Sequence, residues 1–291
     1  MDFYKLALLG HPLGHSRSPE LHQNALDFFQ LDGEYELLDI PEIELEATLK
    51  RLKVQSYAGF NVTIPYKEKI IPLLDDVNSN AAYVGAVNTV KIDQETGKLI
   101  GYNTDAPAFL TSLLSYAGAS AQFENVFILG SGGAAKACRC AISSILSVDV
   151  PIHIITRNVE QAKKWPQRFG PLEIIELTEF IKQPALNKMG STLFINATPL
   201  GQSKDTTPEL VFFDRLVSKF SKDTFVYDLV YPKDLKTKTP FVAAAEKRGF
   251  KNCSGWLMLA MQAATSFSLW TDKAANPDIM IGSWRDDFQK A

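Results

Sequence analysis

The sequence predicts an α/β protein of two domains, with a final long helix that packs back on the first domain. Three observations favour this fold class. Short apolar runs alternate with longer stretches of helical periodicity along the whole chain, which is typical of βαβ units with largely parallel sheets. The 291 residues are many for one hydrophobic core and suit two domains of about 100–150 residues each. A glycine-rich turn between a predicted strand and a predicted helix lies near the middle of the chain.

Residues 1–104 form the first predicted domain. β-Branched and other apolar residues indicate strands at 4–10, 34–40, 57–65 and 85–92. Residues 98–105 follow the turn sequence DQETG as the return arm of a hairpin. Between the strands, apolar residues at helical spacing predict helices over 18–30 and 42–52. The strand over 57–65 is expected to end at Pro65, because proline lacks the N–H that a central strand donates.

The second predicted domain covers residues 105–236. Thr104 or Asp105 can cap its first helix, and the early Pro107 is tolerated because the first N–H groups of a helix are unpaired anyway. Strands are then predicted at 125–130, 151–156, 191–198 and 224–230. Helices are predicted from the glycine-rich turn to about residue 146 and over 159–169.

Residues 237–291 are predicted to supply two further helices, over 239–249 and 255–271. The second is apolar nearly all round, yet it contains Gln262, Thr265 and Ser266. Such a helix is more often buried within a protein than inserted in a bilayer. We therefore expect it to return to the first domain.

Composition and charge argue against several classes of partner. The chain is 46% hydrophobic and 22% charged with a formal net charge of −3, so nothing favours nucleic acid or an anionic membrane. The apolar run at the amino terminus stops at Gly10 and is shorter than the roughly 7–15 residues of a signal-peptide core or the roughly 20 of a membrane span. We expect a cytoplasmic protein with no nucleic acid and no membrane as partner.

Cysteine and histidine usage predicts neither a disulfide framework nor a metal site. Cys138, Cys140 and Cys253 are an odd number without paired C-x-x-C units, which favours reduced structural thiols. Three of the four histidines crowd the first part of the chain, but no carboxylate or cysteine set accompanies them at metal-ligand spacing.

The glycine-rich turn carries a G-x-G-x-x-A arrangement formed by Gly130, Gly132 and Ala135. The first glycine allows the tight turn, the second lets the backbone approach a pyrophosphate, and the alanine lets the helix pack on the strand. The helix N-terminus adds unpaired N–H groups and about half a positive charge. This context predicts a Rossmann-like dinucleotide-binding domain. The alternative is a turn that merely needs small residues.

The end of the next strand predicts which dinucleotide binds. NAD-binding forms carry an acidic residue there for the ribose 2′-hydroxyl, whereas this chain has Thr156, Arg157 and Asn158. A guanidinium with two polar neighbours suits a 2′-phosphate, which predicts NADP as the cofactor. The alternative is that Arg157 is an ordinary solvated arginine.

Polar residues gather where strands of the first domain are predicted to end. Because such folds bind ligands there, these residues are candidates for binding a hydroxylated small molecule, with one titratable pair to move a proton. Each alone has a simpler explanation as a turn or cap residue, and Lys67 as a solvated lysine. The candidates are Ser16, Ser18, Asn61, Thr63, Lys67, Asn88, Asn103 and Asp105.

Taken together, the motifs resemble those of the shikimate dehydrogenase family. In order along the chain they are GHPLGHSRSP, NVTIPYKE, GAVNT, GYNTD, GSGGAAKA, ATPLG, YDLVYP and GWLMLAMQAA, and they span nearly the whole sequence. The resemblance implies a monomeric or homodimeric enzyme that reversibly reduces 3-dehydroshikimate to shikimate with NADPH, on the route to chorismate and the aromatic amino acids.

The same resemblance implies roles for individual residues. Lys67 and Asp105 would be the catalytic pair: Lys67 gives a proton or hydrogen bond to the ketone oxygen, while Asp105 orients the ammonium and favours its charged form. Substrate would be bound by Ser16, Ser18, Asn61, Thr63, Asn88, Tyr231 and Gln262. NADP would be bound by Gly130, Ser131, Gly132, Gly133, Ala134, Thr156, Arg157, Asn158, Thr198, Leu229, Gly255 and Met258. No metal would be required.

Two positions depart from the family pattern. Gln23 stands where many relatives have asparagine after the histidine, and Gln161 stands where a basic residue often helps to hold the 2′-phosphate. The second departure bears on how strongly NADP is preferred.

Three other functions fit parts of the pattern. A quinate/shikimate dehydrogenase of the same fold uses NAD and accepts an extra ring hydroxyl, but Arg157 and the pair Ser16 and Ser18 count against it. A non-catalytic ligand sensor would be expected to lack Lys67 or Asp105, and both are present. A methylenetetrahydrofolate-type dehydrogenase shares only the two-domain plan.

Overall fold

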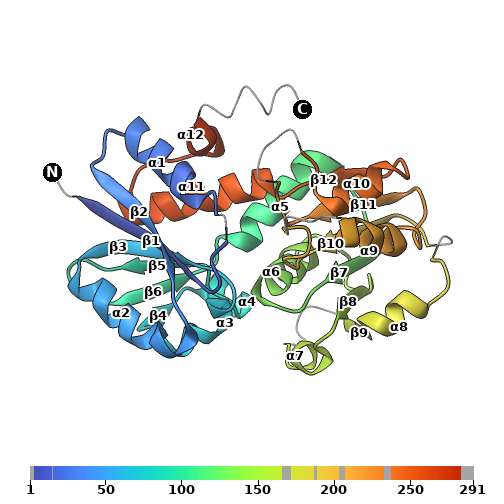
Figure 1. Cartoon of the computed structure of the whole chain (residues 1–291), viewed down its shortest axis with the longest axis horizontal. Helices are drawn as coiled ribbons and strands as arrows, with labels where there is room; N and C mark the ends of the chain where they lie inside the picture. Colours follow the sequence, from blue (N-terminus) through green and yellow to red (C-terminus); the bar gives the residue numbers. More distant parts are fainter. Residues whose placement is uncertain are drawn as a thin grey trace. The chain divides into compact units, whose positions relative to one another are not determined.

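The computed structural model describes residues 3–14, 16–165, 172–186, 189–202, 207–232 and 237–282. The chain divides into two compact units (Figure 1). Unit 1 is formed by Met1–Ala108 together with Leu259–Ala291, and unit 2 by Phe109–Met258. Unit 1 is therefore built from both ends of the sequence. The boundaries expected from the sequence, after residues 104 and 236, fall close to the first of these divisions and well before the second.

Unit 1 contains a six-stranded sheet with the order β2-β1-β3-β5-β6-β4. Its strands are β1 Tyr4–Gly10, β2 Gly33–Asp39, β3 Tyr57–Val62, β4 Asp76–Val77, β5 Thr89–Ile92 and β6 Leu99–Tyr102. β1 is parallel to β2 and β3, whereas β5 is antiparallel to β3 and to β6. The predicted hairpin is confirmed. The predicted largely parallel sheet is confirmed for β1, β2 and β3 and for β4 with β6. The exception is β5, because the short turn between β5 and β6 returns the chain antiparallel.

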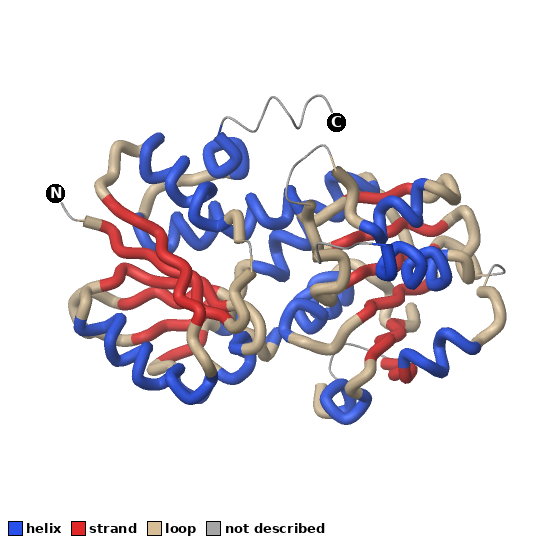
Figure 2. The backbone as a smooth tube through the Cα atoms, in the orientation of Figure 1, coloured by secondary structure: helices blue, strands red, loops and turns tan. Residues whose placement is uncertain are grey.

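Helices cover both faces of the unit 1 sheet, as the blue helices around the red strands show in Figure 2. They are α1 Ser18–Phe28, α2 Leu45–Val54, α3 Tyr66–Lys69, α4 Ser79–Val84, α11 Trp256–Thr271 and α12 Pro277–Ile281, with 3-10 turns at Glu42–Glu44 and Ile71–Leu73. Side chains alternate along a strand. Leu6 and Leu8 of β1 accordingly pack with α1, α11 and α12, while Ala7 and Leu9 pack with α2 on the other face.

The predicted return of the final long helix to the first domain is confirmed. Phe267 and Trp270 of α11 are buried in the same cluster as Leu6 of β1. The indole Nε1 of Trp270 donates to the carbonyl oxygen of Val90 at 2.9 Å. A Cβ added to Gly59 of β3 would come within 2.1 Å of that indole nitrogen. Only glycine at this position lets α11 lie so close to the sheet.

Unit 2 contains a second six-stranded sheet with the order β12-β11-β10-β7-β8-β9. Its strands are β7 Asn125–Leu129, β8 Ile152–Thr156, β9 Leu172–Glu176, β10 Thr192–Asn196, β11 Thr224–Asp228 and β12 Lys251–Cys253. Every pairing in it is parallel. The order is that of the doubly wound dinucleotide-binding fold, which confirms the Rossmann-like prediction.

Helices pack on both faces of this second sheet. They are α5 Asp105–Ala117, α6 Gly133–Ser143, α7 Val159–Lys163, α8 Leu177–Lys182, α9 Thr207–Val217 and α10 Pro240–Glu246. Phe194 of β10 packs on one face with Phe213 of α9 and Phe241 of α10. On the other face, the hydroxyl of Tyr227 lies 2.6 Å from Ser112 Oγ of α5. The helix predicted over 159–169 ends at Lys163, and residues 166–169 lie outside the described part of the chain.

None of the helices in the described ranges has both the length and the apolar character needed to cross a bilayer.

His22 of α1 is a fully buried aromatic residue of the unit 1 core. Its ring stacks on Tyr35, with centroids 4.3 Å apart, and lies 5.3 Å from the ring of Trp270. Burial lowers the pKa of His22 from 6.5 to about 3, because an imidazolium there would lose its hydration. His22 is therefore neutral at physiological pH.

This burial predicts that His22→Phe makes the protein less sensitive to acid. Between about pH 3 and about pH 6.5 the unfolded chain binds a proton at His22 that the folded chain does not, so this residue lowers the free energy of unfolding as the pH falls. Urea denaturation of both proteins from about pH 7 to about pH 4 measures the effect. The free energy of unfolding of the variant minus that of the wild type should increase as the pH falls. A difference that stays constant with pH would contradict a neutral buried His22.

Candidate active site

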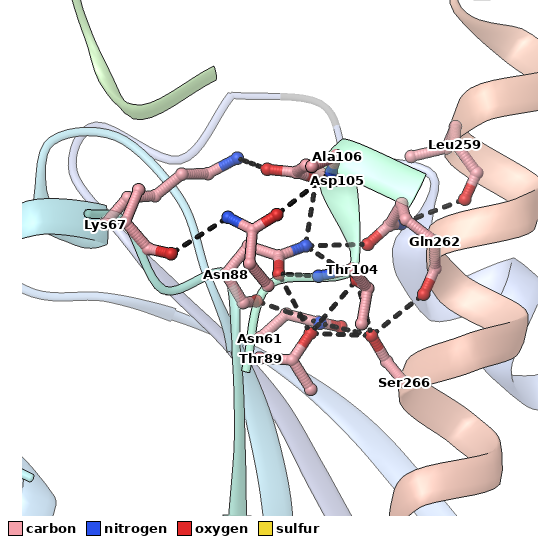
Figure 3. A network of polar contacts seen from close by, with 12 residues as sticks. Asn61, Lys67, Asn88, Thr89, Thr104, Asp105, Ala106, Leu259, Gln262 and Ser266 are labelled. Carbon is pink, nitrogen blue, oxygen red and sulfur yellow. Dashed lines mark hydrogen bonds and ion pairs between the residues drawn. The ribbon is translucent and has the colours of Figure 1, made fainter. Parts of the chain in front are cut away.

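Lys67 and Asp105 form an ion pair at one end of the unit 1 sheet (Figure 3). Lys67 lies in α3, the short helix that follows β3, and Asp105 is the first residue of α5, which follows the β5–β6 hairpin. Lys67 Nζ lies 2.6 Å from Asp105 Oδ2, and the two side chains are 15% and 7% exposed. The carbonyl oxygen of Lys67 accepts the N–H of Val87 at 2.7 Å, which ties α3 to the segment leading into β5. A pair so poorly solvated interacts more strongly than one at the surface.

Asn88 holds the carboxylate of Asp105. The Oδ1 of Asn88 accepts the backbone N–H of Thr104 at 2.7 Å, and this obligatory donor determines which way the amide faces. The Nδ2 of Asn88 then donates to Asp105 Oδ1 at 2.9 Å. Because Asn88 is buried, this bond is shielded from water. Asp105 is thus held through one oxygen and presents the other to Lys67.

Asn103 caps the first turn of α5. Its Oδ1 accepts the N–H of Ala106 at 2.9 Å, and its Nδ2 donates to the carbonyl oxygen of Ala86 at 2.9 Å. The prediction that Thr104 or Asp105 caps this helix is wrong, because Asn103, just before them, already satisfies the N–H group of Ala106. The side chain of Asp105 is therefore free to face Lys67.

Helix α11 adds Gln262 and Ser266 to the same cluster, as Figure 3 shows. Gln262 Oε1 lies 3.4 Å from Asn88 Nδ2, and Gln262 Nε2 donates to the carbonyl oxygen of Leu259 at 2.9 Å. Ser266 Oγ lies 2.7 Å from Thr89 Oγ1 and donates to the carbonyl oxygen of Gln262. These bonds fix α11 to β5 beside the ion pair.

Asn61, at the end of β3, supports this cluster from the neighbouring strand. Its Oδ1 accepts the hydroxyl of Tyr35 at 2.8 Å. Its Nδ2 lies 3.0 Å from both Thr89 Oγ1 and Ser266 Oγ. Both ends of the amide are engaged, so Asn61 belongs to the same buried network as Asn88.

Thr89, Thr104 and Ser266 were not among the predicted site residues. All three are buried, and their hydroxyl oxygens lie 2.7 to 3.3 Å from one another. The sequence contained a signal for them, since Thr89 and Thr104 adjoin Asn88 and Asp105. Ser266 is four residues after Gln262 and so shares its face of the helix.

Ser16 and Thr63 lie in two loops of unit 1, and Ser18 is the first residue of α1. Ser16 Oγ accepts the backbone N–H of Ser18 at 3.2 Å, at the start of α1. Thr63 follows β3, and its methyl group would be 2.5 Å from a Cβ added to Gly10 at the end of β1. Within the described ranges, no side-chain hydrogen bond joins these three residues to the Lys67–Asp105 pair.

This arrangement can donate a proton to an oxygen atom. An ammonium carries three N–H donors, and one of those on Lys67 faces Asp105. The amides of Asn88 and Gln262 supply neutral donors and acceptors close by. A proton donor beside neutral amides suits a reaction at a carbonyl group of a hydroxylated small molecule.

The glycine-rich turn of unit 2 joins β7 to α6. Gly130 has a φ of +115°, which favours glycine, and a Cβ there would come within 3.0 Å of Thr198 Cγ2. At Gly132 an added Cβ would meet nothing within 4 Å. This open space lies at the start of α6, whose first residues are Gly133 and Ala134 and whose first N–H groups have no helical partner. A side chain at position 132 would fill the space, so the turn fits a pyrophosphate.

The loop after β8 is tied to this turn. Ser131 Oγ lies 2.8 Å from Thr156 Oγ1, which accepts the N–H of Asn158 at 3.0 Å. Asn158 caps α7 by accepting the N–H of Gln161 at 3.1 Å, and Gln161 Oε1 lies 3.4 Å from Ser131 Oγ. Arg157 is exposed between them, and its side chain makes no ion pair with any residue that the structure describes. Its guanidinium is therefore available to an anionic ligand.

Further predicted residues follow β10, β11 and β12. A Cβ added to Gly255 would come within 2.1 Å of the carbonyl oxygen of Leu229, so these two backbones are in close contact. The ring of Tyr231 packs against Trp256 with centroids 4.9 Å apart. Met258 is buried. The predicted cofactor residues and Tyr231 belong to unit 2, while the catalytic pair and the other predicted substrate residues belong to unit 1.

Among the residues that the structure describes, no three or more His, Cys, Asp or Glu side chains gather in a group that could hold a metal ion.

Known proteins resemble the chain over nearly all of its length. A family model described as the shikimate dehydrogenase substrate binding domain matches residues 8–90. A relative from Methanococcus maripaludis, "Shikimate dehydrogenase (NADP(+))", is 34% identical, and the match covers 95% of this chain and 94% of the relative.

Solved structures give the same result. The shikimate dehydrogenase of Thermus thermophilus, in complex with NADP(H) and shikimate, matches with a TM-score of 0.75 and 30% identity over 98% of this chain and 99% of that one. The shikimate dehydrogenase of Aquifex aeolicus matches with a TM-score of 0.78 and 27% identity over 98% of this chain and 97% of that one. The similarity therefore includes residues of both units.

Proposed function

Because this chain belongs to the shikimate dehydrogenase family, we propose that Lys67 and Asp105 are the acid–base centre of a reversible reduction of 3-dehydroshikimate to shikimate. The chain is an oxidoreductase, and its cofactor is NADP. The observation that carries the proposal is the poorly solvated ion pair, with Asn88 bound to the far oxygen of the carboxylate. A lysine held in this way is positioned to act on a substrate, whereas a surface lysine is not.

The reaction needs a proton donor at the ketone oxygen. NADPH, when bound, supplies a hydride to the carbonyl carbon, and negative charge develops on the oxygen. Lys67 transfers a proton from Nζ to that oxygen, so the product is an alcohol. Asp105 accepts a hydrogen bond from Nζ and so orients it. In the reverse direction Lys67 Nζ accepts the hydroxyl proton.

The substrate is polyhydroxylated, and the remaining predicted substrate residues are neutral. Gln262 uses one oxygen lone pair toward Asn88 and one N–H toward the carbonyl of Leu259, so its second N–H is left to donate to a ligand. We assign substrate binding to the following residues as a group: Ser16, Ser18, Asn61, Thr63, Asn88, Tyr231 and Gln262. Serine, threonine and amide side chains match ring hydroxyls because each can donate and accept.

The chain's own residues fit NADP. The open space at Gly132 and the start of α6 would receive the pyrophosphate. Thr156, Arg157 and Asn158 would receive the 2′-phosphate, with the guanidinium as a bidentate donor. Gln161 lies close to Ser131 and contributes no charge, so Arg157 is the main source of NADP preference in this loop. The other predicted cofactor residues are Gly130, Gly133, Ala134, Thr198, Leu229, Gly255 and Met258.

The rival activity is that of a quinate/shikimate dehydrogenase that uses NAD. The sequence of the β8 end argues against it, because Thr156, Arg157 and Asn158 offer no carboxylate to the 2′-hydroxyl of NAD. A cytoplasmic location and a monomeric or homodimeric state stay predictions from the sequence and the family.

A steady-state assay of the purified protein tests the proposed function. Shikimate with NADP should be oxidised, as followed by the absorbance of NADPH. Quinate with NAD should react at least about tenfold more slowly in kcat/KM, which corresponds to losing about one charge-assisted contact. Equal or faster turnover of quinate with NAD would assign the rival activity. No turnover of either shikimate or quinate, with either NADP or NAD, would contradict a dehydrogenase.

Arg157→Ala tests whether Arg157 binds the 2′-phosphate of NADP. The KM for NADP should rise about 10- to 150-fold, the equivalent of about 1.5–3 kcal/mol, because a charge-assisted contact is lost. The KM for NAD should change little, since NAD has no 2′-phosphate. Arg215→Ala is the matched control, because Arg215 is an exposed arginine of α9 in the same unit. Equal losses for both cofactors would show that Arg157 supports the loop instead.

A further inference from the structure

Asn196 and Asp228 form a fully buried polar pair in unit 2. They are the last residues of the neighbouring parallel strands β10 and β11, and they lie opposite each other in the strand register. Asn196 Nδ2 donates to Asp228 Oδ1 at 2.8 Å. Carboxyl ends of parallel strands are where this fold binds its ligands. The pair therefore lies at the base of the loops on which a cofactor would rest.

Asn196 shapes the loop that carries Thr198. Its Oδ1 accepts both the backbone N–H of Thr198 at 3.1 Å and the Thr198 hydroxyl at 2.6 Å. Its Nδ2 also donates to the carbonyl oxygen of Leu200 at 3.0 Å. One side chain thus determines where the Thr198 hydroxyl points, and Thr198 in turn packs beside Gly130 of the glycine-rich turn.

Asp228 fastens the loop that follows β11. Its Oδ1 accepts the backbone N–H of Val230 at 3.0 Å, and the carbonyl oxygen of Val230 accepts the N–H of Gly255 at 3.1 Å. Its Oδ2 accepts the hydroxyl of Thr239 at 2.6 Å. Thr239 is the N-cap of α10. The carboxylate therefore joins the end of β10, the loop after β11 and the start of α10.

Packing alone would not require a polar pair at this buried position. Burial raises the pKa of Asp228 to about 7, while the three donors from Thr239, Val230 and Asn196 act in the opposite direction. An apolar side chain would avoid that cost of burial. It could not accept hydrogen bonds from an amide, a hydroxyl and a backbone N–H at once.

We propose that Asn196 and Asp228 are positioning residues for NADP, which hold the backbone around Thr198, Leu229 and Gly255 in the form that receives the cofactor. The inference rests on the proposed function, because those three residues are its predicted cofactor contacts. Leu229 belongs to the same arrangement, since its N–H donates to the carbonyl oxygen of Asn196 at 3.0 Å. Neither member of the pair needs to touch NADP.

The test compares the binding of NADPH with the binding of substrate. NADPH is titrated against purified protein by its fluorescence, without turnover, and the KM for shikimate is measured at saturating cofactor. Asp228→Ala should raise the Kd for NADPH about 10- to 100-fold, the loss expected for one or two hydrogen bonds that order a site. The KM for shikimate should stay within about threefold, because the substrate residues of unit 1 are untouched. Asp228→Asn, which keeps one acceptor oxygen, should recover most of the affinity.

A milder variant covers the case in which Asp228→Ala does not fold. Thr239→Val removes one hydroxyl donor and should raise the Kd for NADPH about 3- to 10-fold, while Thr239→Ser should restore it. Thr224→Val is the control, because this buried threonine of β11 has a hydroxyl without a partner among the described residues. Its Kd for NADPH should equal that of the wild type.

Two results would overturn the inference and leave the proposed function intact. One is wild-type affinity for NADPH in folded Asp228→Ala or Thr239→Val. The other is a parallel rise in the Kd for NADPH and the KM for shikimate, which would make the pair a stabilising element only. If the wild-type protein itself fails to bind NADPH, the proposed cofactor site and the inference both fall.

Discussion

The ion pair between Lys67 and Asp105 is the interaction on which the rest of unit 1's site depends. Both side chains are poorly solvated. Removing one partner of a buried ion pair typically lowers the free energy of unfolding by about 3–5 kcal/mol. The backbone N–H of Thr104 orients Asn88, and Asn88 binds one carboxylate oxygen of Asp105. Thr104 thus orients Asn88, Asn88 orients Asp105, and Asp105 orients the ammonium of Lys67. The ammonium is consequently held in one place before any substrate arrives, which is the preorganisation that acid–base catalysis requires.

The antiparallel hairpin in an otherwise parallel sheet explains how these groups meet. Thr89 of β5 lies opposite Tyr102 of β6, so Asn88, just before β5, is brought beside Thr104, two residues after β6. A parallel crossover would have placed the same two segments at opposite ends of neighbouring strands. Gly59 and Trp270 then let α11 approach closely enough for Gln262 to reach Asn88. Sheet topology and one glycine thus place the polar side chains.

The sequence was sufficient for features that depend on local pattern. The two-domain α/β fold, the glycine-rich turn, the return of α11 and the family followed from periodicity and motifs, whereas the roles given to single residues stay proposals. Features that depend on distant partners were missed. Ser266 meets Asn61 from 205 positions away, and Asn196 meets Asp228 from 32 positions away. Asparagine, serine and threonine at strand ends also resemble ordinary turn residues, so their burial could not be predicted from the sequence.

A double-mutant cycle on Lys67→Met and Asp105→Asn tests most directly whether the pair acts as one unit. Each single substitution should lower kcat/KM for shikimate by about 100- to 10,000-fold, with the Kd for NADPH nearly unchanged. If the two residues work together, the double variant should be about as slow as the slower single variant, since the second change removes nothing further. If instead the losses multiply, so that the double variant is slower by the product of the two, Lys67 and Asp105 act independently and the central role of their ion pair is contradicted.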